Sequence, residues 1–205
     1  PVHLRVGPDG ALYLLDFYNQ AAVHNDTRGP EHGPTNAAVR PDRDHEHGRL
    51  WRIQHRRASP APVPELADAD EAGLVRALDH ANGWVRGTAQ RFLCERAELA
   101  PATHSALQEK AVNAYLPVGR IAALWTLART HPEQLLAVSA SALRDLVPGV
   151  RKNALRALGT LDDWRLTRGL SRPEIVFDES DARARLAGLE LLRRVLPDSA
   201  YPRLI

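Results

Sequence analysis

The stretch Pro117–Thr130 reads PVGRIAALWTLART and carries the pattern on which the fold prediction depends. Gly119 precedes Arg120, the small residue Ala123 follows three positions later, and Leu127 comes four positions after that. This spacing places the residues on one face of a helix with 3.6 residues per turn. A small residue lets a second helix approach closely, and the leucine one turn on fills the space behind it. The stretch therefore predicts a helix that packs tightly on its neighbours.

The same pattern occurs four times along the chain. The arginines that mark it are Arg86, Arg120, Arg151 and Arg185, at separations of 34, 31 and 34 residues. Helix pairs that each bury one face must stack to close a core. The tetratricopeptide period is also about 34 residues, but its aromatic and glycine signature is missing. The repeat therefore predicts a mostly α fold, a HEAT-like α-solenoid of three to four helix pairs over residues 71–205.

The expected helices follow from apolar periodicity and from capping residues. Asn82 is placed to cap one helix, and Pro132 occupies a first-turn position that tolerates proline. The expected helices are a short one from about residue 70, then the helix after Asn82, then 101–115, 117–130, 132–146, 149–161 and 181–196. Val85, Ala89, Phe92 and Leu93 mark the helix after Asn82. The fourth unit has a degraded first helix, 162–170. Connections of a few residues predict antiparallel neighbours.

Residues 1–57 have a different character and predict a β-rich fragment. The chain opens in a strand-like segment, and the turn signal Gly7-Pro8-Asp9-Gly10 follows. Strand-length apolar runs come at residues 11–16 and 48–53, and in the second run Trp51 interrupts the alternation. Between them lies a long polar segment, 17–47. A proline-rich stretch, 58–70, predicts a semi-rigid linker between the two domains.

Composition bounds the function. The chain has no Met, which indicates a fragment of a longer protein, and no apolar run of the roughly 20 residues needed to span a membrane. Formal net charge is only +2, with arginines interleaved among acidic residues, so no nucleic-acid partner is expected. Cys94 is the one cysteine and is expected to be a buried small hydrophobe.

The polar loop 17–47 is the only region dense in chemically active side chains. His45 and His47 are two residues apart, so in extended backbone they point the same way and could share a metal ion. Asp44 beside His45 could orient the ring for proton abstraction from a hydroxyl. The alternative is a solvated loop whose His and Asp side chains hydrogen-bond to the backbone and fix its shape.

Two segments resemble a known family: residues 7–19, GPDGALYLLDFYN, and residues 43–53, RDHEHGRLWRI. They are similar to the closing blade of the membrane-bound dehydrogenases also called PVC-type haem-binding proteins. Members of that family join a β-propeller, like that of soluble quinoprotein sugar dehydrogenases, to HEAT-like repeats, often followed by a c-type cytochrome domain. The resemblance implies that residues 1–57 are the closing strands and long loop of a propeller blade.

The resemblance also implies a site. Propeller loops gather around a central pocket, so the expected residues of a substrate or cofactor mouth are Asp16, Tyr18, Asn19, His24, Arg43, Asp44, His45, His47 and Arg49. No cofactor is expected in the fragment itself, since the CxxCH motif of covalent haem is missing. The parent protein would use pyrroloquinoline quinone, calcium or haem c, on a sugar substrate, in the periplasm or cell envelope.

Two functions remain open at this stage. One is a fragment of a cell-envelope oxidoreductase with a HEAT-repeat scaffold that binds a protein partner; the fragment alone would be inactive, because the pocket needs every blade. The other is a non-catalytic scaffold for protein or polysaccharide.

Overall fold

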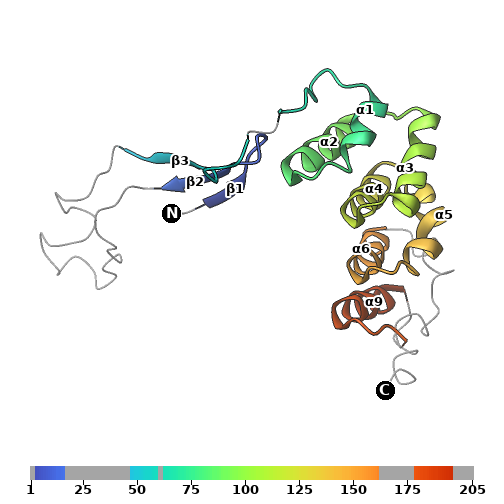
Figure 1. The fold of residues 1–205 in the computed structure, drawn as a ribbon. Coiled ribbons are helices and arrows are strands. Elements are labelled where there is room, and N and C mark those ends of the chain that lie inside the picture. Colours follow the sequence, from blue (N-terminus) through green and yellow to red (C-terminus); the bar gives the residue numbers. More distant parts are fainter. Residues whose placement is uncertain (1–2, 17–46, 60–61, 162–177, 196–205) are drawn as a thin grey trace, which may run out of the picture. The chain divides into compact units, whose positions relative to one another are not determined.

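The computed structural model describes residues 3–16, 47–59, 62–161 and 178–195. The chain is mostly helical and carries a small three-stranded antiparallel sheet (Figure 1). It divides into two compact units, residues 1–63 and 64–205, and each is considered by itself. The division falls within the stretch 58–70 in which the sequence predicts a linker.

The sheet contains β1 (His3–Val6), β2 (Leu12–Asp16) and β3 (Arg49–Ile53), in that order. A tight turn joins the first two strands, with the Gly7 amide donating to the Ala11 carbonyl at 2.8 Å. Gly10 adopts φ +79° in this turn, a conformation that residues with a Cβ rarely tolerate. The predicted strands and turn are therefore confirmed.

The pleat gives the sheet two different faces. Registers that pair Leu4 with Leu14 and Leu14 with Trp51 put these side chains on one face. That face, called here the apolar sheet face, consists of Leu4, Val6, Leu12, Leu14, Trp51 and Ile53. The opposite face carries His3, Arg5, Tyr13, Leu15, Leu50 and Arg52. Trp51 therefore does not break the alternation but belongs to the apolar side.

The apolar sheet face is exposed in the described part of the chain. Trp51 is 46% and Ile53 49% accessible, and Leu4 reaches 52%. A sheet of three strands needs a packed apolar face for independent stability. This sheet therefore requires a covering element that the described residues do not supply.

The second unit contains helices α1 (Glu71–Ala77), α2 (Gly83–Glu95), α3 (Pro101–Asn113), α4 (Pro117–Thr130), α5 (Pro132–Ala142), α6 (Pro148–Leu158) and α9 (Ala182–Val195). Asn82 caps α2 by accepting from the Trp84 amide at 2.9 Å, as predicted. Proline opens α3, α4, α5 and α6, and Pro132 is the first residue of α5. None of the described helices is long and apolar enough to cross a membrane.

Three helices end earlier than the sequence predicts, and the one expected to reach residue 161 ends at Leu158. The helix expected to reach residue 115 ends at Asn113, and the one expected to reach residue 146 ends at Ala142. In both places the following carbonyls bond to an arginine of the next helix instead of continuing the helical ladder. The apolar period runs on past the helix end because Leu143 is still buried in the turn.

The helices pack in two layers. The first layer consists of α1, α3 and α5, and the second layer of α2, α4, α6 and α9 (Figure 1). Each helix contacts the next in its own layer, and α1, α3 and α5 each contact the helix that follows in the other layer. The degraded helix predicted at 162–170 lies outside the described residues.

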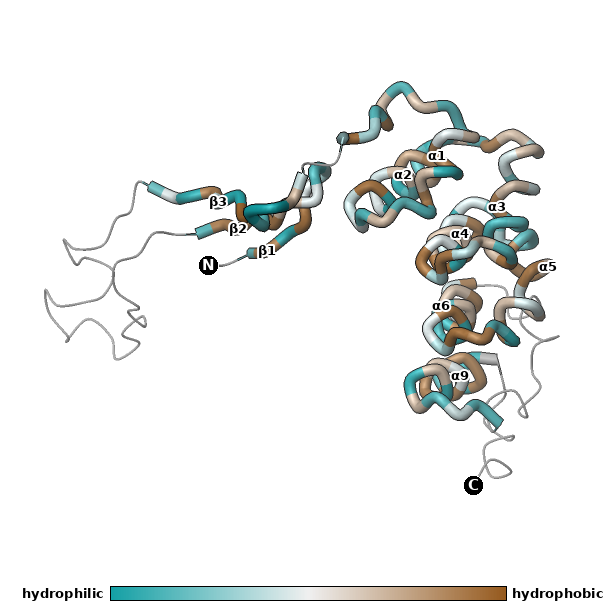
Figure 2. Tube along the Cα trace, viewed as in Figure 1, coloured by the Kyte–Doolittle hydropathy of each residue, from teal (hydrophilic) through white to brown (hydrophobic). Residues whose placement is uncertain are grey.

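The core runs between the layers and follows the predicted repeat. Ala89, Ala123 and Ala154 are fully buried, as are the leucines four positions later, Leu93, Leu127 and Leu158. In α9 the equivalent Leu192 is 3% accessible. Apolar residues recur along each helix in Figure 2. These stripes therefore face neighbouring helices and not water.

Candidate functional site

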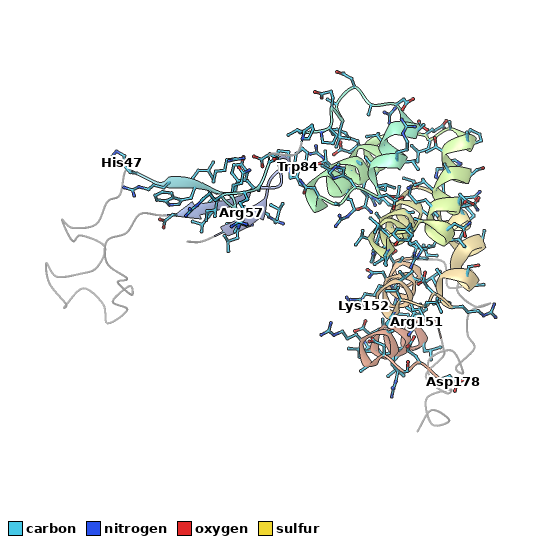
Figure 3. All side chains as sticks on the ribbon, in the orientation of Figure 1. His47, Arg57, Trp84, Arg151, Lys152 and Asp178 are labelled. Atoms are coloured by element: carbon cyan, nitrogen blue, oxygen red, sulfur yellow. The ribbon has the colours of Figure 1, made fainter. Side chains whose placement is uncertain are left out.

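Three of the nine expected mouth residues lie in the described part of the chain, where the strands meet the long loop. Asp16 ends β2 and pairs in register with Arg49, the first residue of β3. The Trp51 indole donates to the Asp16 carboxylate at 3.3 Å, and the Arg49 guanidinium lies 5.6 Å from the centre of the Trp51 ring. His47 lies two residues before β3 and is exposed (Figure 3). By register, Asp16 and Arg49 lie on the same side of the sheet as Trp51, at the polar end of the apolar sheet face.

The remaining mouth residues lie outside the described residues: Tyr18, Asn19, His24, Arg43, Asp44 and His45. The predicted metal pair His45 and His47 is therefore described at one member only. Within the described ranges, no group of three or more His, Cys, Asp or Glu side chains is placed to hold a metal ion.

A polar cluster that the sequence did not reveal lies on the opposite face of the sheet. Asp9 accepts from the Ala11 amide at 3.0 Å, from Tyr13 Oη at 3.2 Å, and from Arg52 Nε at 2.8 Å. The hydrogen bonds from the Ala11 amide and from Arg52 lower the pKa of Asp9. Because these bonds join the β1–β2 turn to β3, the cluster holds the register of the sheet.

The second layer contains a repeated contact, called here the arginine clamp. Arg86, Arg120 and Arg151 each donate from Nη1 to the carbonyls six and five residues earlier. The shorter bonds measure 2.6, 2.6 and 2.8 Å. Arg185 makes a related bond from Nε to the Glu179 carbonyl at 2.9 Å. Each clamp fixes the loop that leads into its own helix.

Two of the clamps also join successive repeats. Arg120 pairs with Asp145 at 2.6 Å, and Arg151 holds Glu179 through two bonds of 2.6 Å. This contact raises the pKa of Arg151 and lowers the pKa of Glu179. Asp145 and Glu179 each stand six residues before the next clamp arginine. The backbone carbonyl of each accepts from that next arginine, and its carboxylate pairs with the arginine of the previous repeat.

The first clamp lacks such an acid because the equivalent position is Ala114. There Lys110 pairs with Asp79, and the Gln90 amide donates to the Ala122 carbonyl at 3.4 Å. The sequence identified the arginines but missed Asp145 and Glu179. Their shared offset from the next arginine was the available signal, and it was concealed by the alanine and by His80 in the other two units.

Charge is divided unequally between the layers. The second-layer helices contain eleven Lys or Arg residues and two acids, Glu95 and Glu190. The first-layer helices contain two Lys or Arg residues and three Glu. The small net charge of the whole chain conceals this difference.

Exposed apolar side chains lie on the loops whose carbonyls bond to clamp arginines, and near the starts of the helices that follow. Tyr115 is 93% and Leu146 is 95% accessible, and both occupy the position five residues before a clamp arginine. Trp84 and Val118, each two residues before a clamp arginine, are 39% and 38% accessible. Because the backbone of these loops is bound inward, the side chains extend outward.

Three further titratable features lie within the helical unit: a histidine pair, Glu71 and Cys94. The ring centroids of His104 and His131 lie 3.5 Å apart with the ring planes tilted by 46°, and burial with the neighbouring ring lowers the pKa of His104. Glu71 binds the Ala100 amide at 3.0 Å and the Thr103 hydroxyl, and these bonds lower its pKa. Cys94 is half-buried, whereas the sequence predicted a buried side chain. Its partial burial raises the pKa of the thiol. Glu71 thus joins the start of α3 to α1, and the raised thiol pKa of Cys94 disfavours the nucleophilic thiolate.

Comparison with known proteins gives one finding. Residues 1–57 match a family described as a domain of unknown function, DUF7133. No curated protein and no solved structure matches the chain.

Proposed function

We propose that residues 64–205 form a HEAT-like solenoid that serves as a scaffold for a protein partner. The observation that carries the proposal is the arginine clamp, which recurs at one offset in Arg86, Arg120 and Arg151. Each repeat thereby fixes its own loop, and two clamps also bind the next repeat. A stack that contacts mainly its sequential neighbours is the defining property of solenoids.

The same contacts support a binding role. A scaffold must present side chains in fixed positions, since ordering them on binding would cost affinity. Tyr115 and Leu146 are almost fully exposed on loops whose carbonyls are held by Arg120 and Arg151. Large apolar side chains on a rigid backbone are common anchors in protein interfaces.

A photo-crosslinking experiment in the native host tests the scaffold. A photoreactive amino acid replaces Tyr115 or Leu146 in the full-length protein, with an equivalent replacement of buried Leu124 as the control. We expect a discrete adduct with one protein from the exposed positions and none from the buried one. Only uncrosslinked protein at every exposed helical position would contradict the scaffold.

The second candidate is that residues 1–57 are the closing strands of a β-propeller in a cell-envelope oxidoreductase. Its support is the resemblance of residues 7–19 and 43–53, together with the exposed apolar sheet face, which a neighbouring blade would cover. In such a parent protein, Asp16, Arg49 and His47 would lie where the strands open into the loop. Pyrroloquinoline quinone, calcium or haem c would supply the redox chemistry on a sugar-like alcohol.

Assay of the full-length parent protein tests this candidate. Purified protein is incubated with pyrroloquinoline quinone and calcium, and dye reduction is followed with a panel of aldoses. We expect turnover that falls in Asp16→Asn and His47→Ala variants. Absence of turnover across the panel would favour a non-catalytic propeller that binds protein or polysaccharide.

A further inference from the structure

We propose that the outer face of the second layer binds an acidic, amphipathic protein segment. The proposal rests on the scaffold function and specifies its surface and the chemistry of its partner. The face is formed by the solvent side of α2, α4, α6 and α9, which follow one another in contact. Trp84 and Lys152 lie on the side of the helical unit turned away from α3 and α5 (Figure 3).

The cations on this face recur at equivalent positions of the repeat. One residue after the clamp arginine stands Lys152, and five residues after it stand Arg91 and Arg156. Nine residues after it stand Arg129 and Arg194. Because packed helices lie about 8–10 Å apart, equivalent side chains form rows across the layer.

These charges are not neutralised within the second layer. Arg91 has an exposed partner in Glu95 at 3.7 Å, a surface pair worth little. For Lys152, Arg156 and Arg183 the described residues provide no ion-pair partner. A surface with one dominant sign attracts a partner of the opposite sign and speeds its encounter.

Apolar side chains between the cations indicate which kind of polyanion fits. Leu186 is 52% accessible, and Trp84 and Val118 add exposed apolar surface near the start of their helices. Trp125 is half-buried, and its indole donates to Asn153 at 2.9 Å, so its ring edge is engaged. Aliphatic side chains do not bind phosphates, whereas they do pack against the apolar face of an acidic helix. The surface therefore favours protein over nucleic acid.

Binding of a designed probe tests the proposal with the full chain. The probe is a fluorescein-labelled peptide of about 20 residues with Glu and Leu at helical spacing. Polyglutamate of the same length tests charge alone, and single-stranded and duplex oligonucleotides test nucleic acid. Anisotropy is measured at low and at physiological salt.

Two double variants with the same change in charge locate the surface. Lys152→Glu with Arg156→Glu alters the second layer, and Arg76→Glu with Arg144→Glu alters exposed positions in α1 and just after α5. Circular dichroism verifies that both variants fold. We expect the second-layer variant to bind the peptide about tenfold more weakly, and the control to change by less than about twofold.

Several results would overturn the proposal. Equal weakening by the two variants, or no measurable peptide binding, would remove the second-layer face as the site. Tighter binding of an oligonucleotide would assign the face to nucleic acid, and equal binding of polyglutamate would remove the apolar contribution. Crosslinked adducts from Tyr115 or Leu146 with no peptide binding would leave the scaffold standing while this surface fails.

Discussion

Replacing Arg151 by alanine is expected to destabilise the helical unit more than any other loss of a clamp arginine. Arg151 makes two bonds of 2.6 Å to Glu179, whose side chain is only 7% accessible, and one of 2.8 Å to the Asp145 carbonyl. A hydrogen bond involving a charged group contributes about 1.5–3 kcal/mol. A buried carboxylate left without its partner costs about 3–5 kcal/mol. Since the Arg151 side chain is 15% accessible and water can partly replace it, we expect the free energy of unfolding to fall by about 3–4 kcal/mol.

Arg86→Ala is the matched control because Arg86 makes the carbonyl bonds, while the position equivalent to the acids of the later clamps is Ala114. Its expected cost is about 1–2 kcal/mol. Urea unfolding at neutral pH, followed by far-ultraviolet circular dichroism, measures both. In the Arg151→Ala, Glu179→Ala double variant, about 2 kcal/mol should return, because no unpaired carboxylate remains. If Arg151→Ala costs no more than Arg86→Ala, the pairing between repeats does not stabilise the stack.

Three further outcomes are expected. Gly119→Ala should destabilise the helical unit by about 1–3 kcal/mol, since the new Cβ would meet the Asp79 carboxylate. Gly87→Ala, at an exposed helix position, should stabilise it by up to about 1 kcal/mol. Thermal melts that rank the two variants the other way would contradict the packing. The lowered pKa of His104 means that folding favours its neutral form. The free energy of unfolding should therefore fall as pH drops below 6.5 towards the folded-state pKa of His104. A His104→Gln variant should lose this pH dependence, and an unchanged dependence would exclude the ring pair with His131 as its cause. Cys94 should react with iodoacetamide at pH 8 more slowly than a free thiol, because burial keeps it protonated, and equal rates would show that the site opens readily.

The repeat could be predicted from the sequence because its burial is local. Ala123 and Leu127 belong to one helix, so their spacing alone identifies the buried face. The partner of Arg151 could not be found in this way, since Glu179 is 28 residues away and belongs to the next unit. Contacts between repeats depend on how helices stack, and a periodicity within one helix carries no record of them.

The unequal charge of the two layers and the two faces of the sheet could not be predicted from the sequence, because both depend on contacts between elements. A net charge of +2 is a sum over the chain, and only the assignment of helices to layers separates Lys152 and Arg156 from the acids of the first layer. In β3, the adjacent apolar residues Leu50 and Trp51 hide the alternation, and the register with Leu14 was needed to place Trp51 on the apolar sheet face. Of the nine residues expected at the mouth, Asp16, His47 and Arg49 lie in the described part of the chain, while the other six stay predictions.

The unequal charge of the described helices contributes an electric dipole directed from α1, α3 and α5 towards α2, α4, α6 and α9. Near a negatively charged body, such a dipole experiences a torque that turns the basic side forward before any contact forms. At physiological ionic strength the field fades within about 8 Å, so the reorientation belongs to the last moments of approach. Collisions would then begin pre-aligned, and added salt would make them random again.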